Sequence, residues 1–280
     1  MRLALLAGAI ALGLLGVAWL QVATIDVTSL ATKVPERTAL MRQRAREASA
    51  KGRAYTERRH WVPYERISPS LRRAVLVAED DAFFSHDGLD WNEIKASAQK
   101  NWRTRQFARG GSTITQQLAK NLWLGTERTP TRKFKELLLA LRLERALSKK
   151  RIFELYLNSI EWGDGVYGID AAANRWFATS AAGLSARQSV RLAAVIINPR
   201  RYSPVAPDRR IERRTRMIAS RLRRRGALSD ADYRAVLDLP DPAPTAADSL
   251  SLSPARSPAD SVPVAPPPPV VPDTAATEGR

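Results

Sequence analysis

The sequence predicts a mostly α-helical fold. Apolar residues recur at helical spacing through the middle of the chain, and several of these runs start at residues that commonly cap helices. No stretch of any length alternates apolar and polar residues as a half-buried strand does. A chain of 280 residues is long enough for one large domain or two small ones.

Residues 1–25 predict a transmembrane signal-anchor. Leu3 to Ile25 is apolar apart from two residues, and Arg2 places positive charge before it. At about 1.5 Å per residue, a helix of this length spans the roughly 30 Å hydrocarbon core of a bilayer. A cleavable signal peptide is the alternative. The long apolar run and the lack of a clear cleavage site favour an uncleaved anchor.

The next part of the chain divides into a stalk and a domain. Residues 26–60 are polar and predict a partly helical stalk, whereas residues 61–237 hold most of the apolar runs and predict the folded domain. Helical spacing predicts a helix over Leu71 to Glu79. Asp90 and Glu93 have the spacing of a capping box, which predicts the start of another helix.

Breakers and caps mark the later helices. Thr113 to Trp123 contains no helix breaker and predicts a helix, with Ser112 as its N-cap. Pro130 fits the first turn of the next helix, which carries a strong apolar stripe. Glycines at 163, 165 and 168 predict a tight loop. Further helices are expected after Ser148, after a capping box at Ser185 and Gln188, near Arg209, and after Ser229.

Residues 238–280 predict a disordered tail. Of the 18 prolines, 11 lie from Pro240 onward among Ala, Ser and Asp, a composition that cannot bury a core. The tail is slightly acidic, so the positive charge of the chain is concentrated in the domain.

The charge balance predicts polyanionic partners. Lys and Arg total 45 against 28 Asp and Glu, a net charge of +17. Nucleic acid, an anionic membrane and a phosphorylated substrate all fit this excess. The anchor and the lack of a basic-aromatic motif disfavour nucleic acid. The absence of cysteine excludes disulfides and thiolate sites, and two histidines leave little for a metal site.

Two blocks carry the candidate chemistry. Glu79 to Gly88 reads EDDAFFSHDG, in which Glu79 can act as a general base if its site is partly enclosed. The alternative is a solvated helix end, with His86 as a structural loop residue. Gly110 to Asn121 reads GGSTITQQLAKN, and its amides and lysine can bind sugar hydroxyls and phosphate. Here the alternative is a loop that leads into a capped helix.

Three further blocks follow. In the third, Glu136 lies among Arg132 and two lysines, which alternatively form an ordinary surface ion-pair cluster. Arg128, just upstream, carries a guanidinium suited to bidentate contact with phosphate. The fourth block, residues 152–169, and the last, residues 192–204, are expected to be largely structural.

These five blocks, in order over residues 75–204, resemble the family 51 glycosyltransferases, and within them the monofunctional biosynthetic peptidoglycan transglycosylases. The resemblance implies a lysozyme-like transglycosylase domain behind an N-terminal transmembrane helix. It implies no transpeptidase domain, because the chain changes to tail after about residue 237. It also implies a single-pass protein of the bacterial cytoplasmic (inner) membrane, with the domain on the periplasmic side.

The implied reaction polymerises lipid II into β-1,4 glycan strands, with inversion at C1 and release of polyprenyl diphosphate. The implied partners are lipid II, the growing glycan chain, the anionic membrane and other wall-synthesis or division proteins. No cofactor is required, although Mg or Mn is a candidate divalent cation. By resemblance Glu79 is the catalytic base, and Glu136 is a second carboxylate that orients partners or binds a divalent ion. The implied substrate-binding and supporting residues are Lys120 and Arg128 for the pyrophosphate, Ser112, Gln116 and Gln117 at the donor site, and Phe83, His86 and Arg132.

The chain departs from the family pattern in two places. Asp81 stands where the family often has Arg, and Ser189-Val190 and Ile197 replace the usual Ala-Ala and Pro. Neither departure removes a catalytic group, and the first is expected to weaken a local ion pair around Glu79. Two rival functions remain open. One is a lytic glycan-cleaving enzyme on the same fold, and the other is a non-catalytic membrane-anchored wall-binding protein.

Overall fold

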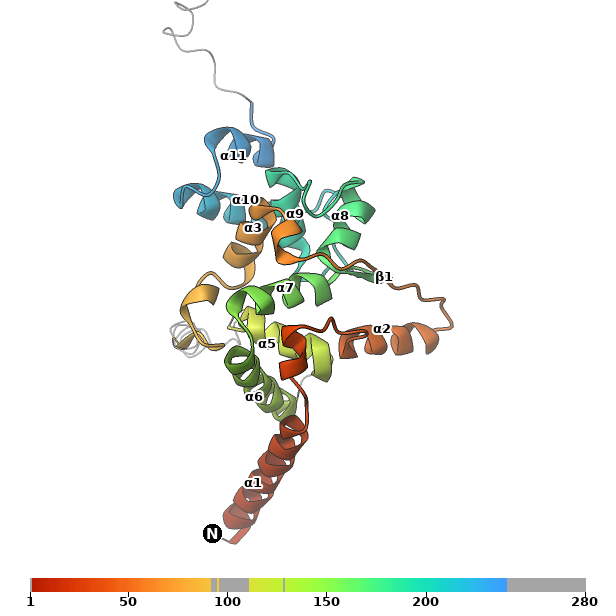
Figure 1. The fold of residues 1–280 in the computed structure, drawn as a ribbon, viewed down its shortest axis with the longest axis vertical. Coiled ribbons are helices and arrows are strands. Elements are labelled where there is room, and N and C mark those ends of the chain that lie inside the picture. The colour runs from red at the N-terminus through yellow and green to blue at the C-terminus, as the bar shows by residue number, and fades with distance from the viewer. Residues whose placement is uncertain (1, 92–94, 96–110, 128, 241–280) are drawn as a thin grey trace, which may run out of the picture. The chain divides into compact units, whose positions relative to one another are not determined.

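The computed structural model describes residues 2–91, 95, 111–127 and 129–240 (Figure 1). Residues 1–240 form one compact unit. Of the predicted tail, residues 238–240 are described, and residues 241–280 lie outside the described residues. Most of the helix predicted to follow Asp90 also lies outside them. The helices in chain order are α1 (Arg2–Ala23), η1 (Thr28–Ala31), α2 (Ala39–Ser49), η2 (Tyr64–Arg66), α3 (Pro69–Glu79), η3 (Phe83–Ser85), α5 (Ile114–Ala119), η4 (Lys120–Leu124), α6 (Pro130–Ala146), α7 (Lys149–Ser159), α8 (Ile169–Phe177), α9 (Ala186–Val195), α10 (Arg209–Arg224) and α11 (Asp230–Leu237).

The mostly helical prediction is confirmed. Helix α7 lies at the centre of the domain, where Phe153 and Tyr156 are fully buried. Helices α5 and α6 pack together, α5 also packs against α7, and α3 packs against α9 and α10 (Figure 1). Apolar side chains from these helices form one continuous core, which fixes the ends of α3 and α5 relative to each other.

Helix α1 leads into the domain and packs against α6, where the Arg142 guanidinium donates to the carbonyl of Val22 (Figure 1). Within the part of the chain that the structure describes, no helix combines the length and apolarity needed to cross a membrane. The predicted transmembrane helix is therefore not confirmed.

A small sheet is present that the sequence did not predict. Strands β1 (Arg58–Arg59), β2 (Glu161–Gly163) and β3 (Val166–Tyr167) have the order β1-β3-β2, with β1 parallel and β2 antiparallel to β3. Strands of two or three residues are too short to show the alternation by which a strand is predicted. The predicted glycine loop is the β2–β3 turn, where Gly165 adopts φ +71°.

The predicted stalk contributes to the same unit as the domain. Helix α2 packs against η4, and β1 pairs with β3 through Arg58 opposite Val166. Leu40, Met41 and Tyr167 form a separate small apolar cluster. The proposed boundary at residue 61 remains a prediction.

Most predicted helix starts are confirmed. Ser148, Ser185 and Ser229 accept hydrogen bonds from the backbone N–H groups three residues later. The N-cap of α5, however, is Thr113 and not Ser112. Its hydroxyl accepts from the Gln116 N–H at 3.2 Å, while the Gln116 side chain accepts from the Thr113 N–H at 3.2 Å. This reciprocal capping box satisfies two backbone donors, one more than a simple cap does.

Candidate active site

The candidate site centres on Glu79, the last residue of α3. Its side chain is 12 % exposed, so the alternative of a solvated helix end is wrong. The Arg214 guanidinium donates to Oε1 at 2.5 Å, and the Gln117 amide donates to Oε2 at 3.1 Å. Burial raises the pKa of Glu79, and Arg214 and Gln117 oppose that rise. A carboxylate with a raised pKa is suited to remove a proton near neutral pH.

Gln117 is held in a defined orientation by Tyr156. The Tyr156 hydroxyl donates to Gln117 Oε1 at 3.1 Å, so the amide nitrogen of Gln117 is the end that faces Glu79. Burial raises the pKa of Tyr156 well above its usual range, which keeps the hydroxyl neutral and able to donate. Tyr156, which was expected only as a scaffold residue, therefore orients a direct partner of the carboxylate.

Asp80 and His86 join the end of α3 to the start of α5. Asp80 accepts from the Ile114 N–H at 2.9 Å and from His86 Nε2 at 3.0 Å. His86 Nδ1 accepts from the Gly88 N–H at 3.1 Å, which places the ring proton on Nε2. His86 thus holds the loop in place. The ring of Phe83 is fully buried and packs edge-on against His86, so both residues support the site from behind.

Glu136 on α6 is buried, with 3 % of its side chain exposed. Its Oε2 pairs with Arg132 at 2.5 Å, and its Oε1 pairs with Lys133. The alternative of an ordinary surface cluster is wrong, because the apolar stripe of α6 draws this carboxylate into the interior. A buried carboxylate that pairs with two cationic side chains holds both of them in defined positions.

Lys133 also reaches the second block, which the sequence analysis missed. Its Nζ donates to Ser112 Oγ at 3.2 Å and to Gln116 Oε1 at 3.4 Å. The spacing of a lysine three residues before Glu136 signalled an ion pair, but not this contact with another segment. Gln116 is buried and engaged by both the capping box and Lys133.

Glu79 lines a pocket of about 200 Å³, here called the Glu79 pocket. Asp81, Ser112 and Thr113 also line it, as does Arg221 from α10. Asp81 forms an ion pair with Arg225, so in this chain the residue at the family's usual arginine position has its own cationic partner. Arg214 supplies the ion pair to Glu79, and the expected weakening of that pair by Asp81 stays a prediction.

A second pocket of about 400 Å³ is here called the Lys120 pocket. Gln117, Lys120 and Arg132 line it together. Burial lowers the pKa of Lys120, and the nearby charge of Glu136 opposes this effect. The structure thus brings Glu79, Gln117 and Lys120 together, because Gln117 donates to Glu79 and lines the same pocket as Lys120. Arg128 lies outside the described residues.

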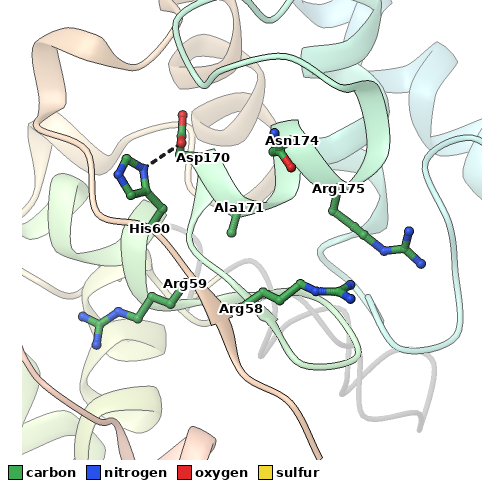
Figure 2. Close-up of a pocket in the computed structure, with 7 residues that line it drawn as sticks. All are labelled: Arg58, Arg59, His60, Asp170, Ala171, Asn174 and Arg175. Atoms are coloured by element: carbon green, nitrogen blue, oxygen red, sulfur yellow. Dashed lines mark hydrogen bonds and ion pairs between the residues drawn. The ribbon is translucent and has the colours of Figure 1, made fainter.

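A third and larger pocket, of about 660 Å³, lies between β1 and α8 (Figure 2). Its carboxylate, Asp170, accepts from His60 Nδ1 at 2.7 Å and from the Ala181 N–H at 2.7 Å. Both oxygens are therefore engaged. Figure 2 shows Arg58 and Arg175 extending away from this pair. Because this pocket offers no enclosed carboxylate like Glu79, it is a weaker candidate for catalysis despite its size.

Arg214 is the most important site residue that the sequence analysis missed. The sequence predicts only a helix near Arg209 and does not single out Arg214. That helix packs against α3, which brings the guanidinium to Glu79 and to the Ala78 carbonyl at 3.1 Å. Its distance of 135 residues along the chain from Glu79 left no local signal.

The fit of a divalent cation at Glu136 is poor. Both of its oxygens already pair with cationic side chains. Across the described ranges, no three or more His, Asp or Glu side chains gather as a metal site. We therefore derive no catalytic step through a metal at this position.

Comparison with known proteins places this chain in a family. Residues 46–223 match the family described as Transglycosylase. A "Biosynthetic peptidoglycan transglycosylase" of Methylobacillus flagellatus is 52% identical over 163 residues, which are 58% of this chain and 71% of the relative. One of Laribacter hongkongensis is 47% identical over 189 residues, which are 67% and 82% of the two chains. The chain belongs to the transglycosylase family.

Proposed function

We propose that this protein is a peptidoglycan glycosyltransferase that polymerises lipid II into β-1,4 glycan strands. The observation that carries the proposal is the enclosed Glu79 carboxylate beside a pocket lined by Lys120 and Arg132. Relatives at 52% and 47% identity are named biosynthetic peptidoglycan transglycosylases. A base next to a cationic pocket fits a transfer reaction whose leaving group is a pyrophosphate.

In the proposed mechanism, the acceptor sugar enters the Glu79 pocket and its 4-hydroxyl meets the carboxylate. Each oxygen of Glu79 accepts one hydrogen bond from the protein and keeps capacity for another. Glu79 removes the hydroxyl proton as the oxygen attacks C1 of the growing chain. The C1–oxygen bond to polyprenyl diphosphate breaks, and the α-linkage inverts to β.

The leaving group is proposed to lie in the Lys120 pocket. Lys120 and Arg132 both line this pocket. Arg132 pairs with Glu136, whose charge also acts on Lys120, and Arg128 is proposed to join these two cations. Positive charge fixed before the reaction stabilises the negative charge that develops on the departing diphosphate. Glu136 is proposed to hold Arg132 and Lys133 in place, and Lys133 in turn contacts Ser112 and Gln116.

The protein is further proposed to act at the outer face of the bacterial cytoplasmic membrane, with α1 as its anchor. Large apolar side chains along α1 are exposed, among them Leu12 at 71% and Trp19 at 56%. Exposed apolar surface of this kind marks a contact with lipid or protein. Retention of the full chain in membranes after alkaline washing tests this part of the proposal, and release into the wash would contradict it.

Gel-resolved polymerisation of labelled lipid II by the full chain and by Glu79→Gln tests the function. Wild type is expected to make polymer, and the variant is expected to be slower by about 10² or more, the usual range for loss of a general base. Equal polymer from both would discard Glu79 as the base. No polymer from wild type, in detergent and in liposomes, would discard the polymerase.

A further inference from the structure

Glu161, the first residue of β2, is an unexplained carboxylate in the Lys120 pocket. Its side chain is 4 % exposed, and its Oε1 has no hydrogen-bond partner among the described residues. Glu161 lines the same pocket as Lys120 and Gln117. A buried carboxylate oxygen without a donor is costly, so a group that donates to it would be bound favourably.

The other oxygen of Glu161 is fixed by a residue from α2. Arg44 Nε donates to Glu161 Oε2 at 3.0 Å, and Arg44 Nη1 donates to Glu47 at 3.0 Å. Arg200 continues the network by donating to Glu47 at 3.1 Å. Because the guanidinium of Arg44 is shared between two carboxylates, it donates to one oxygen of Glu161 and leaves the other oxygen without a donor.

The lining of this pocket selects the kind of ligand. A free carboxylate oxygen repels anions and accepts from hydroxyl or amide N–H groups. Asn121 and Asn198, which line the same pocket, offer side-chain amides that both donate and accept. A metal ion is disfavoured because the Arg44 guanidinium already pairs with this carboxylate. A neutral sugar with hydroxyl and acylamino groups fits these partners.

We infer that Glu161 is a sugar-binding residue, whose Oε1 accepts a hydrogen bond from a hydroxyl or amide N–H of an N-acylated amino sugar in the donor glycan. Arg44 is the positioning residue that holds it. The Lys120 pocket then binds the diphosphate through Lys120 and Arg132 and a neutral sugar through Glu161. The identity of the glycan rests on the proposed function.

The test is titration of the full chain with a lipid-free peptidoglycan tetrasaccharide, which lacks the diphosphate. In Glu161→Gln, the amide oxygen can still accept from Arg44, which turns the amide nitrogen, a donor, toward the sugar. Binding is expected to weaken about tenfold or more, as for loss of a hydrogen bond to a charged group. The matched control is Glu47→Gln, which removes the other carboxylate on Arg44 and should bind within about twofold of wild type.

Glu161→Asp provides a second measurement that retains the charge, and its affinity is expected to fall between wild type and Glu161→Gln. Unchanged binding by Glu161→Gln, or an equal loss in Glu47→Gln, would overturn the inference, as would a wild type that does not bind the tetrasaccharide. With lipid II, Glu161→Gln should raise KM more than it lowers kcat. A wild type that binds the fragment through Glu161 yet makes no polymer would overturn the proposed polymerase alone.

Discussion

Arg214→Met is expected to move the acidic limb of the pH–rate profile to higher pH. Arg214 donates to Glu79 at 2.5 Å and stabilises its ionised form, so removing it raises a pKa that burial has already raised. A hydrogen bond to a charged group contributes about 1.5–3 kcal/mol, which corresponds to about 1–2 pKa units. The base works when ionised, so kcat/KM at acidic pH falls while the rate well above both pKa values approaches that of wild type.

The assay is initial-rate polymerisation of lipid II across the pH range, with kcat/KM fitted at each pH. Arg213→Met is the control, since Arg213 is an exposed neighbour on the same helix. Arg214→Lys keeps the positive charge and should restore much of the shift. If the acidic limb of Arg214→Met coincided with that of wild type, Arg214 would not set the pKa of the base.

Two further variants test the partners of the site. Tyr156→Phe leaves Gln117 Oε1 without its donor, at a cost of about 1–3 kcal/mol. If the amide then turns away from Glu79, kcat should fall by about 5- to 150-fold. An unchanged kcat in the polymerisation assay would contradict this orienting role. Glu136→Gln leaves Arg132 and Lys133 without their anion and should lower the free energy of unfolding, measured by urea denaturation, by about 2–3 kcal/mol. This loss is smaller than that for a wholly buried pair, because Lys133 is 47% exposed. Glu65→Gln, at an exposed pair with Lys150, should leave the urea midpoint in place.

Local signals in the sequence predicted the helices well. Ser148, Ser185 and Pro130 mark helix starts because caps and first-turn prolines act within one turn of backbone. The Thr113 cap was misplaced by one residue because serine and threonine stand side by side there and both can cap. Which of them does so depends on the reciprocal contact with Gln116.

The candidate site was only partly predictable, because some of its contacts join residues that are far apart in the sequence. Glu79, Gln117 and Lys120 lie in two blocks close in sequence, so their motifs could be recognised together. Arg214 reaches the site through the packing of α10 on α3, which no spacing rule encodes. The pairing of Arg44 with Glu161 also joins residues 117 positions apart.

The pairing of β1 with β3 sets an order of events in folding. Arg58 pairs with Val166, 108 residues later along the chain (166 − 58). At about 5–20 residues per second, a ribosome needs about 5–20 s to make the intervening segment. Until then β1 lacks its partner strand. Arg44 likewise lacks its partner Glu161, which is made 117 residues later. The contact between α2 and β2 therefore forms late, so a partly synthesised chain would carry the Glu79 carboxylate before the Lys120 pocket was complete.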